Sequence, residues 1–319
     1  MSLLKQHCLV NGQWIASSNE KTADVTNPST GEVVATVPQL QESEVEDAVE
    51  AAHQAWLSWR DTPAKERSRL LKKWFELLTE FADEIANIMV QEQGKPLSDA
   101  KGEMAYANSF IEWFAEEAKR AYGKTLPSPS SHDRLWTLKQ PVGVCGIITP
   151  WNFPAAMITR KVGPALAAGC SCLIKPAMQT PLTALAMAAL AEKAGIPEGV
   201  INVVTGDAKM IGQVLTTHDQ VRKVSFTGST QVGRLLMEQS ASTIKKLSLE
   251  LGGNAPFLVF DDADIEAAVD GLIKAKFRNT GQVCIAPNRV YVQSAIYEKF
   301  AEQLSKQVST LTVADGLQE

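Results

Sequence analysis

From residue 135 onward, short apolar runs alternate with helical stretches, and this alternation constrains the fold more than any other feature of the sequence. Five runs have the character of buried strands: GVCGIITP, CSCLIKP, GVINVVTG, VRKVSFTG and KKLSLELGG. Uninterrupted apolar strands separated by helices are typical of a parallel sheet with both faces covered. The pattern therefore predicts a doubly wound α/β domain, in which ligands bind beyond the carboxyl ends of the strands.

Three helices are expected before this core. The first starts near Ser43, with Glu46 as its capping-box partner. The second runs from Thr62-Pro63 until Gly94 ends it, and the third covers about 97–121.

Shorter elements are expected at the two ends of the chain. Residues 8–38 resemble short strands, with Asn11-Gly12 as a type I′ hairpin signal. Beyond residue 254, the order is the strand APFLVF, a helix, a glycine-bearing loop, the strand NRVYVQ and a helix over 294–310.

Composition and charge exclude several classes of protein. The 319 residues suffice for about two domains, and the net charge of −5 comes from interspersed charges, which argues against a nucleic-acid surface. Residues 141–159 are uncharged but contain three prolines, so we expect a strand, a loop and a helix start there and no membrane span. The N-terminus lacks an apolar signal core, so a cytoplasmic location is expected.

The cysteines and histidines predict neither disulfides nor a metal site. Five cysteines are an odd number, no C-x-x-C pair occurs, and the four histidines are scattered.

Four turns after the predicted strands contain polar residues. Asn152, in TPWNFP, is either a turn former or an amide held firmly enough to donate to an oxyanion. Lys175 is expected to reach a polar ligand rather than to be solvated. Gly228 and Gly233 bracket a strand-to-helix turn whose free backbone N–H groups suit a phosphate, although a full G-x-G-x-x-G motif is absent. Glu250 ends an apolar strand, where burial would raise its pKa for general-base work, and an ion-paired or capping role is about equally expected.

The loop FRNTGQVCIAPNR contains Cys284 between Arg278 and Arg289. A free thiol with an unshifted pKa is only about 3% ionised at pH 7, so a nucleophile needs help from its surroundings. No histidine lies in any of these turns, which weakens a cysteine-hydrolase interpretation without excluding it.

Together these turns resemble the NAD(P)-dependent aldehyde dehydrogenase superfamily, over essentially the whole chain. The specific parts are PWNFP, KPA, FTGST, LELGGNAP and NTGQVCIAPNR, in that order. The resemblance implies that Cys284 attacks the aldehyde, that Asn152 and the Cys284 backbone N–H form the oxyanion hole, and that Glu250 activates the water that hydrolyses the thioester. It also implies that NAD(P) accepts hydride and contacts nine positions: Trp151, Asn152, Lys175, Pro176, Ala177, Met178, Gly228, Ser229 and Leu251.

Within the superfamily, NFPAAMITRKVGPALAAGC and KFRNTGQVC look most like succinate-semialdehyde dehydrogenases. The resemblance implies that Arg160 and Arg278 hold the substrate's distal carboxylate, for which arginine is well suited. A helix-surface ion pair is the alternative for Arg160, and glutarate semialdehyde is the competing substrate. Relatives that prefer NAD often carry a glutamate where this chain has Met178, so NADP is expected to be preferred and NAD accepted.

The resemblance also sets expectations about organisation. It implies an aldehyde-dehydrogenase-like fold, with a cofactor domain over 1–253, an oligomerisation arm over 123–141, and the start of a second α/β catalytic domain over 254–319. Ala286 occupies the place of a second cysteine found in some relatives, so a redox-switch disulfide is not expected.

Family chains extend well past the equivalent of Glu319, so we expect these 319 residues alone to be weakly active or inactive and to expose apolar surface. Homo-oligomers, dimers or tetramers, are expected of the full-length form. A truncated, non-catalytic cofactor-binding protein remains the alternative from a different class.

Overall fold

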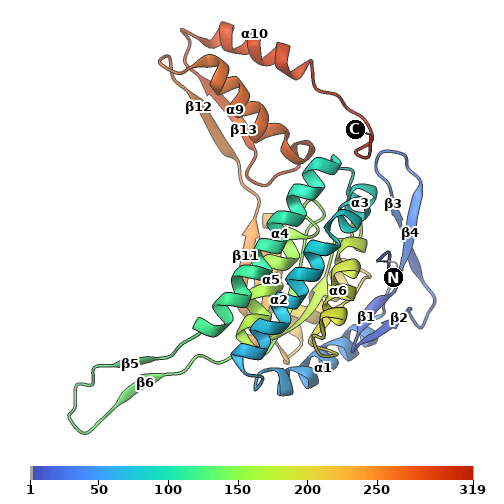
Figure 1. The fold of residues 1–319 in the computed structure, drawn as a ribbon, viewed down its shortest axis with the longest axis vertical. Helices are drawn as coiled ribbons and strands as arrows, with labels where there is room; N and C mark the ends of the chain where they lie inside the picture. Colours follow the sequence, from blue (N-terminus) through green and yellow to red (C-terminus); the bar gives the residue numbers. More distant parts are fainter. Residues whose placement is uncertain (1–2, 319) are drawn as a thin grey trace.

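The computed structural model of the chain describes residues 3–318 and is built around a seven-stranded sheet (Figure 1). The strand order is β11-β10-β7-β8-β9-β1-β2. The parallel strands are β7 (Val144–Ile148), β8 (Ser171–Lys175), β9 (Ile201–Val203), β10 (Val221–Gly228) and β11 (Lys246–Leu251). Because the chain proceeds from β7 to β9 in one direction and then continues at β10 on the other side of β7, the doubly wound α/β prediction is confirmed.

Helices cover both faces of this sheet. Alternate residues of a strand point to opposite faces, so one strand can contribute side chains to two apolar clusters. Cys145 and Ile147 of β7 pack into one apolar cluster, and Val144 and Ile148 pack into another. The first cluster includes five helices: α2 (Ala64–Glu80), α3 (Ala82–Gln93), α4 (Leu97–Glu117), α5 (Ala156–Ala168) and α6 (Leu182–Ala194). The second lies under α1 (Glu42–Trp59), α7 (Ala208–Thr217) and α8 (Thr230–Ser240).

The N-terminal strands form two antiparallel hairpins. β1 (Cys8–Val10) and β2 (Gln13–Ile15) join the sheet edge, and β3 (Thr22–Thr26) pairs with β4 (Val33–Pro38). Asn11 and Gly12 both have left-handed backbones, with φ of 50° and 72°, as a type I′ turn requires. The hairpin prediction is therefore confirmed.

The predicted start of α1 is wrong by two residues. Gln41 is the N-cap, and its backbone N–H donates to Glu44 Oε2 at 2.7 Å, so the capping box is Gln41–Glu44 rather than Ser43–Glu46. Glu44 also accepts from the Ser18 backbone N–H at 2.8 Å. This contact from the preceding hairpin fixes the box at a position that local sequence does not reveal.

The predicted second helix is two helices in the structure. Phe81, with φ −99° and ψ 15°, separates α2 from α3, and its ring lies 4.4 Å below Lys193 Nζ of α6. Pro63 rather than Thr62 occupies the N-cap, while Thr62 Oγ1 donates back to Ser58 O. Gly94 ends α3 with φ 86°, as predicted.

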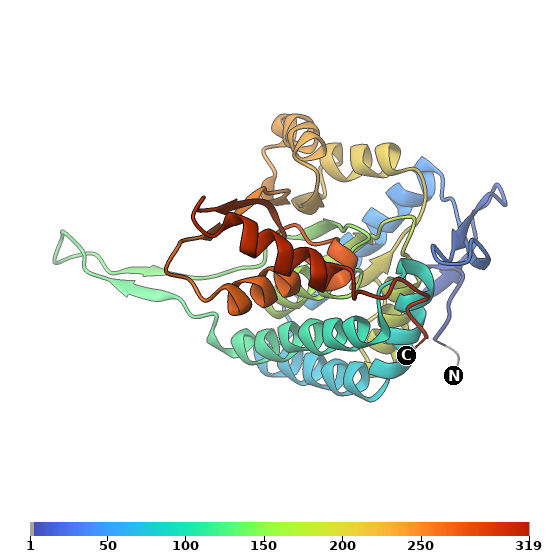
Figure 2. The same ribbon diagram turned by 90° about the horizontal axis from the view of Figure 1, so that it is seen from above.

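Two parts of the chain stand apart from the main body (Figures 1 and 2). The arm, residues 123–141, contains β5 (Lys124–Leu126) and β6 (Leu135–Thr137) and projects outward. The C-terminal segment contains β12 (Ala255–Val259), α9 (Ile265–Phe277), β13 (Pro287–Val292) and α10 (Tyr297–Val308). Its two strands are parallel, and it has its own apolar cluster of Val259, Val269, Leu272 and Phe300.

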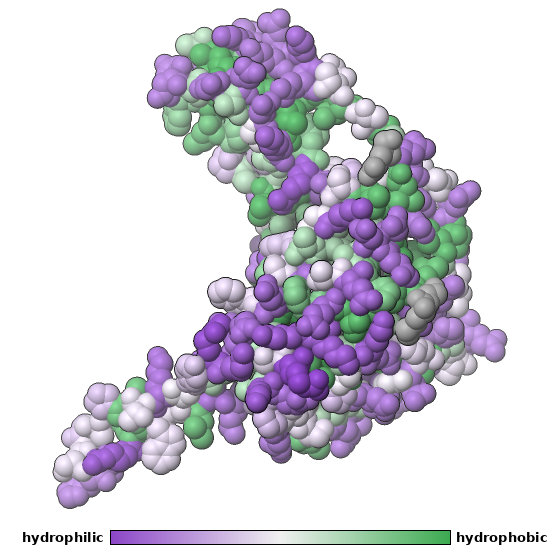
Figure 3. Space-filling model, viewed as in Figure 1, coloured by the Kyte–Doolittle hydropathy of each residue, from purple (hydrophilic) through white to green (hydrophobic). Residues whose placement is uncertain are grey.

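Apolar side chains are exposed on both of these parts (Figure 3). The arm exposes Leu126, Leu135, Trp136 and Leu138, and the C-terminal segment exposes Leu258, Phe260 and Ile285. After α10 the chain returns to the start of α4, where Leu97 N donates to Gly316 O at 2.9 Å. Within residues 3–318, none of the helices combines the length and the apolar character needed to cross a bilayer.

Candidate active site

The carboxyl ends of four strands define one edge of the sheet. Lys175 lies opposite Ile148, which lies opposite Phe226, and Gly228 lies opposite Leu251. This register places the turns that follow β7, β8, β10 and β11 side by side. The turns selected from the sequence therefore meet at the edge where open α/β sheets bind ligands.

The turn after β7 contacts the loop that contains Cys284. Asn152 Nδ2 donates to Gln282 O at 2.7 Å, two residues before Cys284. The loop after β11 reaches the same place, because a Cβ added to Gly253 would lie 3.5 Å from Cys284 O. Three of the predicted motifs, PWNFP, LELGGNAP and NTGQVC, thus converge around one thiol.

Cys284 differs from the other cysteines in its exposure. It is exposed, whereas Cys8, Cys145, Cys170 and Cys172 are buried. Burial raises the pKa of Cys172 well above its usual range, so its reactive thiolate form is disfavoured. Among the cysteines of residues 3–318, Cys284 is the one whose side chain is exposed to a substrate.

The backbone before Cys284 is unusual. Asn279 and Thr280 both have a backbone φ of 54°. This is the left-handed region, which residues other than glycine and asparagine rarely adopt. Asn279 is 1% exposed, and its backbone N–H donates to Asp99 Oδ2 at 2.9 Å. The loop is therefore held from α4, and Asn279 is a site residue that sequence reasoning did not identify.

Glu250 is placed differently from the expectation. It is exposed on the edge strand β11, where Lys246 and Ser248 are also exposed. The expected burial is absent, because within residues 3–318 one face of β11 is exposed. Within residues 3–318, no hydrogen bond joins Glu250 to the Cys284 loop.

A buried lysine that the sequence analysis missed lies near Glu250. Glu250 is opposite Thr227 in the sheet, and Lys161 Nζ donates to Thr227 Oγ1 at 2.7 Å. Burial lowers the pKa of Lys161 to about 8, and the Glu250 carboxylate opposes this shift. A buried amine with a lowered pKa therefore lies beside the strand pair that contains Glu250.

Arg160 is held by aromatic residues of α4. Its Nη2 donates to Tyr106 Oη at 2.9 Å, and its guanidinium lies 5.0 Å from the centre of the Phe110 ring. The alternative of a surface ion pair is wrong within the part of the chain that the structure describes. Arg278 is exposed at the start of the Cys284 loop. Arg289, for which the sequence suggested no role, donates to Asn254 O at 2.7 Å.

The turn after β10 has the features of a phosphate site. Ser229 caps α8 by accepting from Val232 N at 3.3 Å, and the first helical N–H groups point outward from the helix end. A Cβ on Gly233 would lie 2.7 Å from Leu251 Cδ2, so glycine allows α8 to pack closely on β11.

Lys175 lies two strands away from this turn, about 10 Å at the usual strand spacing. It is 5% exposed, and burial lowers its pKa. Of the other predicted cofactor positions, Pro176 and Ala177 are buried, Trp151 is 38% exposed, and Met178 Sδ accepts from Gly206 N at 3.3 Å. A buried amine and an open helix N-terminus at the same edge of the sheet fit an anionic dinucleotide.

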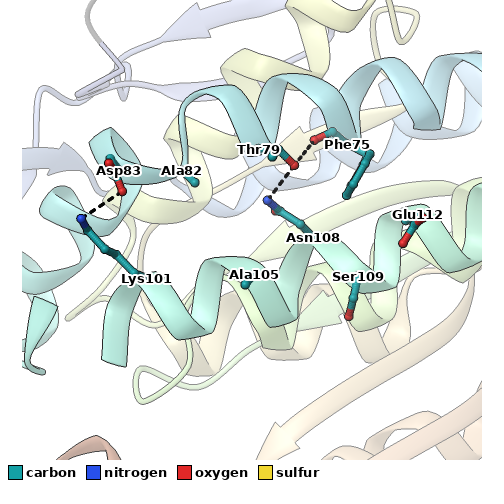
Figure 4. Close-up of a pocket in the computed structure, with 9 residues that line it drawn as sticks. All are labelled: Phe75, Thr79, Ala82, Asp83, Lys101, Ala105, Asn108, Ser109 and Glu112. Atoms are coloured by element: carbon teal, nitrogen blue, oxygen red, sulfur yellow. Dashed lines mark hydrogen bonds and ion pairs between the residues drawn. The ribbon is translucent and has the colours of Figure 1, made fainter. Parts of the chain in front are cut away.

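A groove of about 380 Å³ lies elsewhere, between α2, α3 and α4 (Figure 4). Its lining includes Thr79, Asn108 and the ion pair between Lys101 and Asp83. None of the residues predicted from the sequence lines it, so we do not assign it to the active site.

Comparisons with known proteins cover almost the whole chain. The sequence profile described as "Aldehyde dehydrogenase family" matches residues 14–319. Glutarate-semialdehyde dehydrogenase of Pseudomonas putida is 57% identical over 317 residues, which cover 99% of this chain and 66% of that protein. Succinate-semialdehyde dehydrogenase [NADP(+)] GabD of Escherichia coli is 56% identical over 316 residues, with the same coverage.

A solved structure is equally similar. The crystal structure of succinate-semialdehyde dehydrogenase from Burkholderia pseudomallei superposes with a TM-score of 0.98 at 56% identity, covering 100% of this chain and 66% of that one. The chain thus spans just under two thirds of the length of the relatives that it matches.

Proposed function

Because the chain belongs to the aldehyde dehydrogenase family, we propose that it forms part of an enzyme that oxidises succinate semialdehyde to succinate with NADP or NAD. The observation that carries the proposal is the contact between Asn152 Nδ2 and Gln282 O, at 2.7 Å, beside the exposed thiol of Cys284. This contact supports a site in which the amide donor and the nucleophile come from distant parts of the sequence.

The proposed chemistry assigns one task to each group. Cys284 Sγ attacks the aldehyde carbon and forms a thiohemiacetal, while the Asn152 amide and the Cys284 backbone N–H stabilise the negative charge on oxygen. When bound, the nicotinamide supplies the oxidant by accepting hydride. Glu250 then takes a proton from water, which adds to the thioester and releases the acid and the Cys284 thiol. Lys161, buried beside Thr227, supplies a nearby positive charge when it is protonated.

The residues that would hold the dinucleotide lie along the same edge of the sheet. The open N-terminus of α8 suits the pyrophosphate. Lys175 is buried and makes no ion pair among the described residues, so its charge is available to the adenosine ribose or its phosphate. We propose NADP as the preferred cofactor because Met178 presents no carboxylate to a 2′-phosphate.

The proposal is tested by the absorbance of reduced nicotinamide after succinate semialdehyde is added with NADP or NAD. Any turnover by the wild-type protein above that of Cys284→Ala supports it, because the 319 residues alone are expected to be at most weakly active. Cofactor binding without turnover would instead favour a cofactor-binding protein. Glutarate semialdehyde is the second candidate substrate, because the Pseudomonas putida relative at 57% identity carries that name, and a panel of both aldehydes compares them.

Replacing either guanidinium at the proposed tail site is expected to weaken binding of the substrate carboxylate. Arg160→Met and Arg278→Met should each raise KM for succinate semialdehyde by about 10- to 100-fold, because a charge-assisted hydrogen bond contributes ~1.5–3 kcal/mol. The control is an uncharged aldehyde of similar length, whose KM should change little. Equal losses for both aldehydes would contradict a carboxylate-binding role.

The cofactor proposal predicts the effect of a new carboxylate. Met178→Glu should lower kcat/KM for NADP by about 10-fold or more while leaving NAD little changed, because the glutamate repels a 2′-phosphate. Met178→Gln has the same shape without the charge and should retain the wild-type preference. If the two variants behaved alike, the charge argument would be wrong.

We also propose the organisation expected from the sequence, with a cofactor domain over 1–253 and the start of a catalytic domain over 254–319. The separate apolar cluster of the C-terminal segment supports this division. The projecting arm, with Trp136 at 67% exposure, supports a homo-oligomer in which the arm is covered. The cytoplasmic location stays a prediction.

A further inference from the structure

A fully buried ion pair lies beneath the turn that contains Asn152. Lys95, in the segment between α3 and α4, bonds through Nζ to Glu103 Oε2 of α4, and neither side chain has any exposed surface. Burying two charges costs several kcal/mol per ion unless further hydrogen bonds compensate. The other partners of this pair therefore indicate what it does.

These partners all lie in one short turn. Lys95 Nζ donates a second bond to Asn152 O at 2.9 Å. Glu103 Oε1 accepts from the backbone N–H groups of Ala155 and Ala156, at 2.9 and 3.1 Å, where α5 begins. Lysine thus holds the middle of the turn between β7 and α5, and glutamate holds the end of the turn where α5 begins.

The Cys284 loop also holds the Asn152 peptide. Asn279 Nδ2 donates to Asn152 O at 3.0 Å and to Gln282 O at 3.3 Å. Asn152 Nδ2 donates to the same Gln282 O at 2.7 Å. Because an amide nitrogen has two hydrogens, one is used by Gln282 and the other is available to a substrate oxygen.

We infer that Lys95, held by Glu103, is a positioning residue that fixes the Asn152 peptide and thereby aims its free amide hydrogen at an oxyanion formed on Cys284. This inference rests on the proposed function. Oxyanion donors act because they are already oriented before the charge develops. A misplacement of about 1 Å can cost about 10²-fold in rate.

The competing explanation is that the pair only caps α5. Such a role would change stability without selectively changing the chemistry of an oxyanion. The double variant Lys95→Met with Glu103→Gln separates the two roles, since the glutamine oxygen can still accept from Ala155 N and Ala156 N. It removes the bond from Lys95 to Asn152 O, keeps the bond from Asn279, and leaves no isolated buried charge.

Two reactions of Cys284 provide the readout, and neither requires a nicotinamide. With p-nitrophenyl acetate, Sγ bonds to the carbonyl carbon through a tetrahedral oxyanion, and the C–O bond breaks to release p-nitrophenolate and leave a thioester. With iodoacetamide, Sγ displaces iodide from carbon and no oxyanion forms. The ratio of the acylation rate to the alkylation rate therefore reports the oxyanion donor separately from the thiol.

The double variant is expected to lower this ratio by about 10-fold or more, with the alkylation rate within about twofold of wild type. Asn279→Gly is the second variant, because glycine accepts the left-handed backbone while the amide donor to Asn152 O is lost. It should lower the ratio in the same direction even if the double variant does not fold. Lys101→Met is the matched control, since Lys101 makes an exposed 3.3 Å pair with Asp83 on the other side of α4 (Figure 4).

The inference would be overturned if the folded double variant and the folded Asn279→Gly variant both kept the wild-type ratio of acylation to alkylation. Equal losses of acylation and alkylation would also overturn it. Failure of the proposed function gives a different pattern. In that case Asn152→Ala itself would leave the ratio unchanged, or Cys284→Ala would still be acylated. The two failures are therefore distinguishable within one set of measurements.

Discussion

Cys284→Ala is expected to abolish both aldehyde oxidation and acylation by p-nitrophenyl acetate, with a loss of about 10³-fold or more, because no other group can take over a missing nucleophile. The exposure of the five cysteines is the structural basis of this prediction. The thiol is exposed in the loop that Asn152 contacts, and the other four cysteines are buried. The substitution removes a single sulfur atom from an exposed position, so the melting temperature should change little.

Thiol titration is the internal control for this variant. The native wild-type chain should react rapidly at one thiol and, in denaturant, at all five. Cys284→Ala should show no rapid reaction when folded. Retention of acylation by the folded variant would remove Cys284 from the mechanism, and rapid labelling of another cysteine would show that the burial is not maintained in solution.

Asn152→Ala is expected to lower the acylation rate by about 10²- to 10³-fold, the usual cost of losing one oxyanion donor. Alkylation by iodoacetamide should stay within about twofold of wild type, because that reaction develops no charge on oxygen. The variant also loses the bond to Gln282 O, so the free energy of unfolding should fall by about 1 kcal/mol.

Asn152→Asp is the matched comparison, since it preserves the shape but replaces the donor with an acceptor. It should be at least as impaired in acylation as the alanine variant. If Asn152→Asp were acylated at the wild-type rate, the role of the amide would be in positioning the loop rather than in stabilising charge.

The sheet and its ligand-binding edge could be predicted from the sequence because both depend on local patterns. Alternating apolar runs identified β7 to β11, and strand ends followed by polar residues identified Asn152 and Lys175. A type I′ turn at Asn11-Gly12 likewise depends on two neighbouring residues. In each case the physical cause lies within a few residues of its effect.

The features that were missed or misplaced depend on contacts between distant segments. Glu44 rather than Glu46 caps α1 because Ser18 donates to it, and Phe81 interrupts a helix where it packs under Lys193. Lys95 and Glu103 look like ordinary surface charges in the sequence, and only the fold places them together inside the protein.

The position of β11 at the edge of the sheet has a practical consequence for experiments on Glu250. Unpaired edge strands are templates for association between chains, and charges along the strand disfavour it. Lys246 and Glu250 are the charged residues on the exposed face of β11. An apolar substitution at Glu250 therefore removes a safeguard against aggregation as well as a proposed base. A lost activity in such a variant has chemical meaning only if it is expressed per molecule of soluble, monodisperse protein, and Glu250→Gln is the substitution that keeps the edge polar.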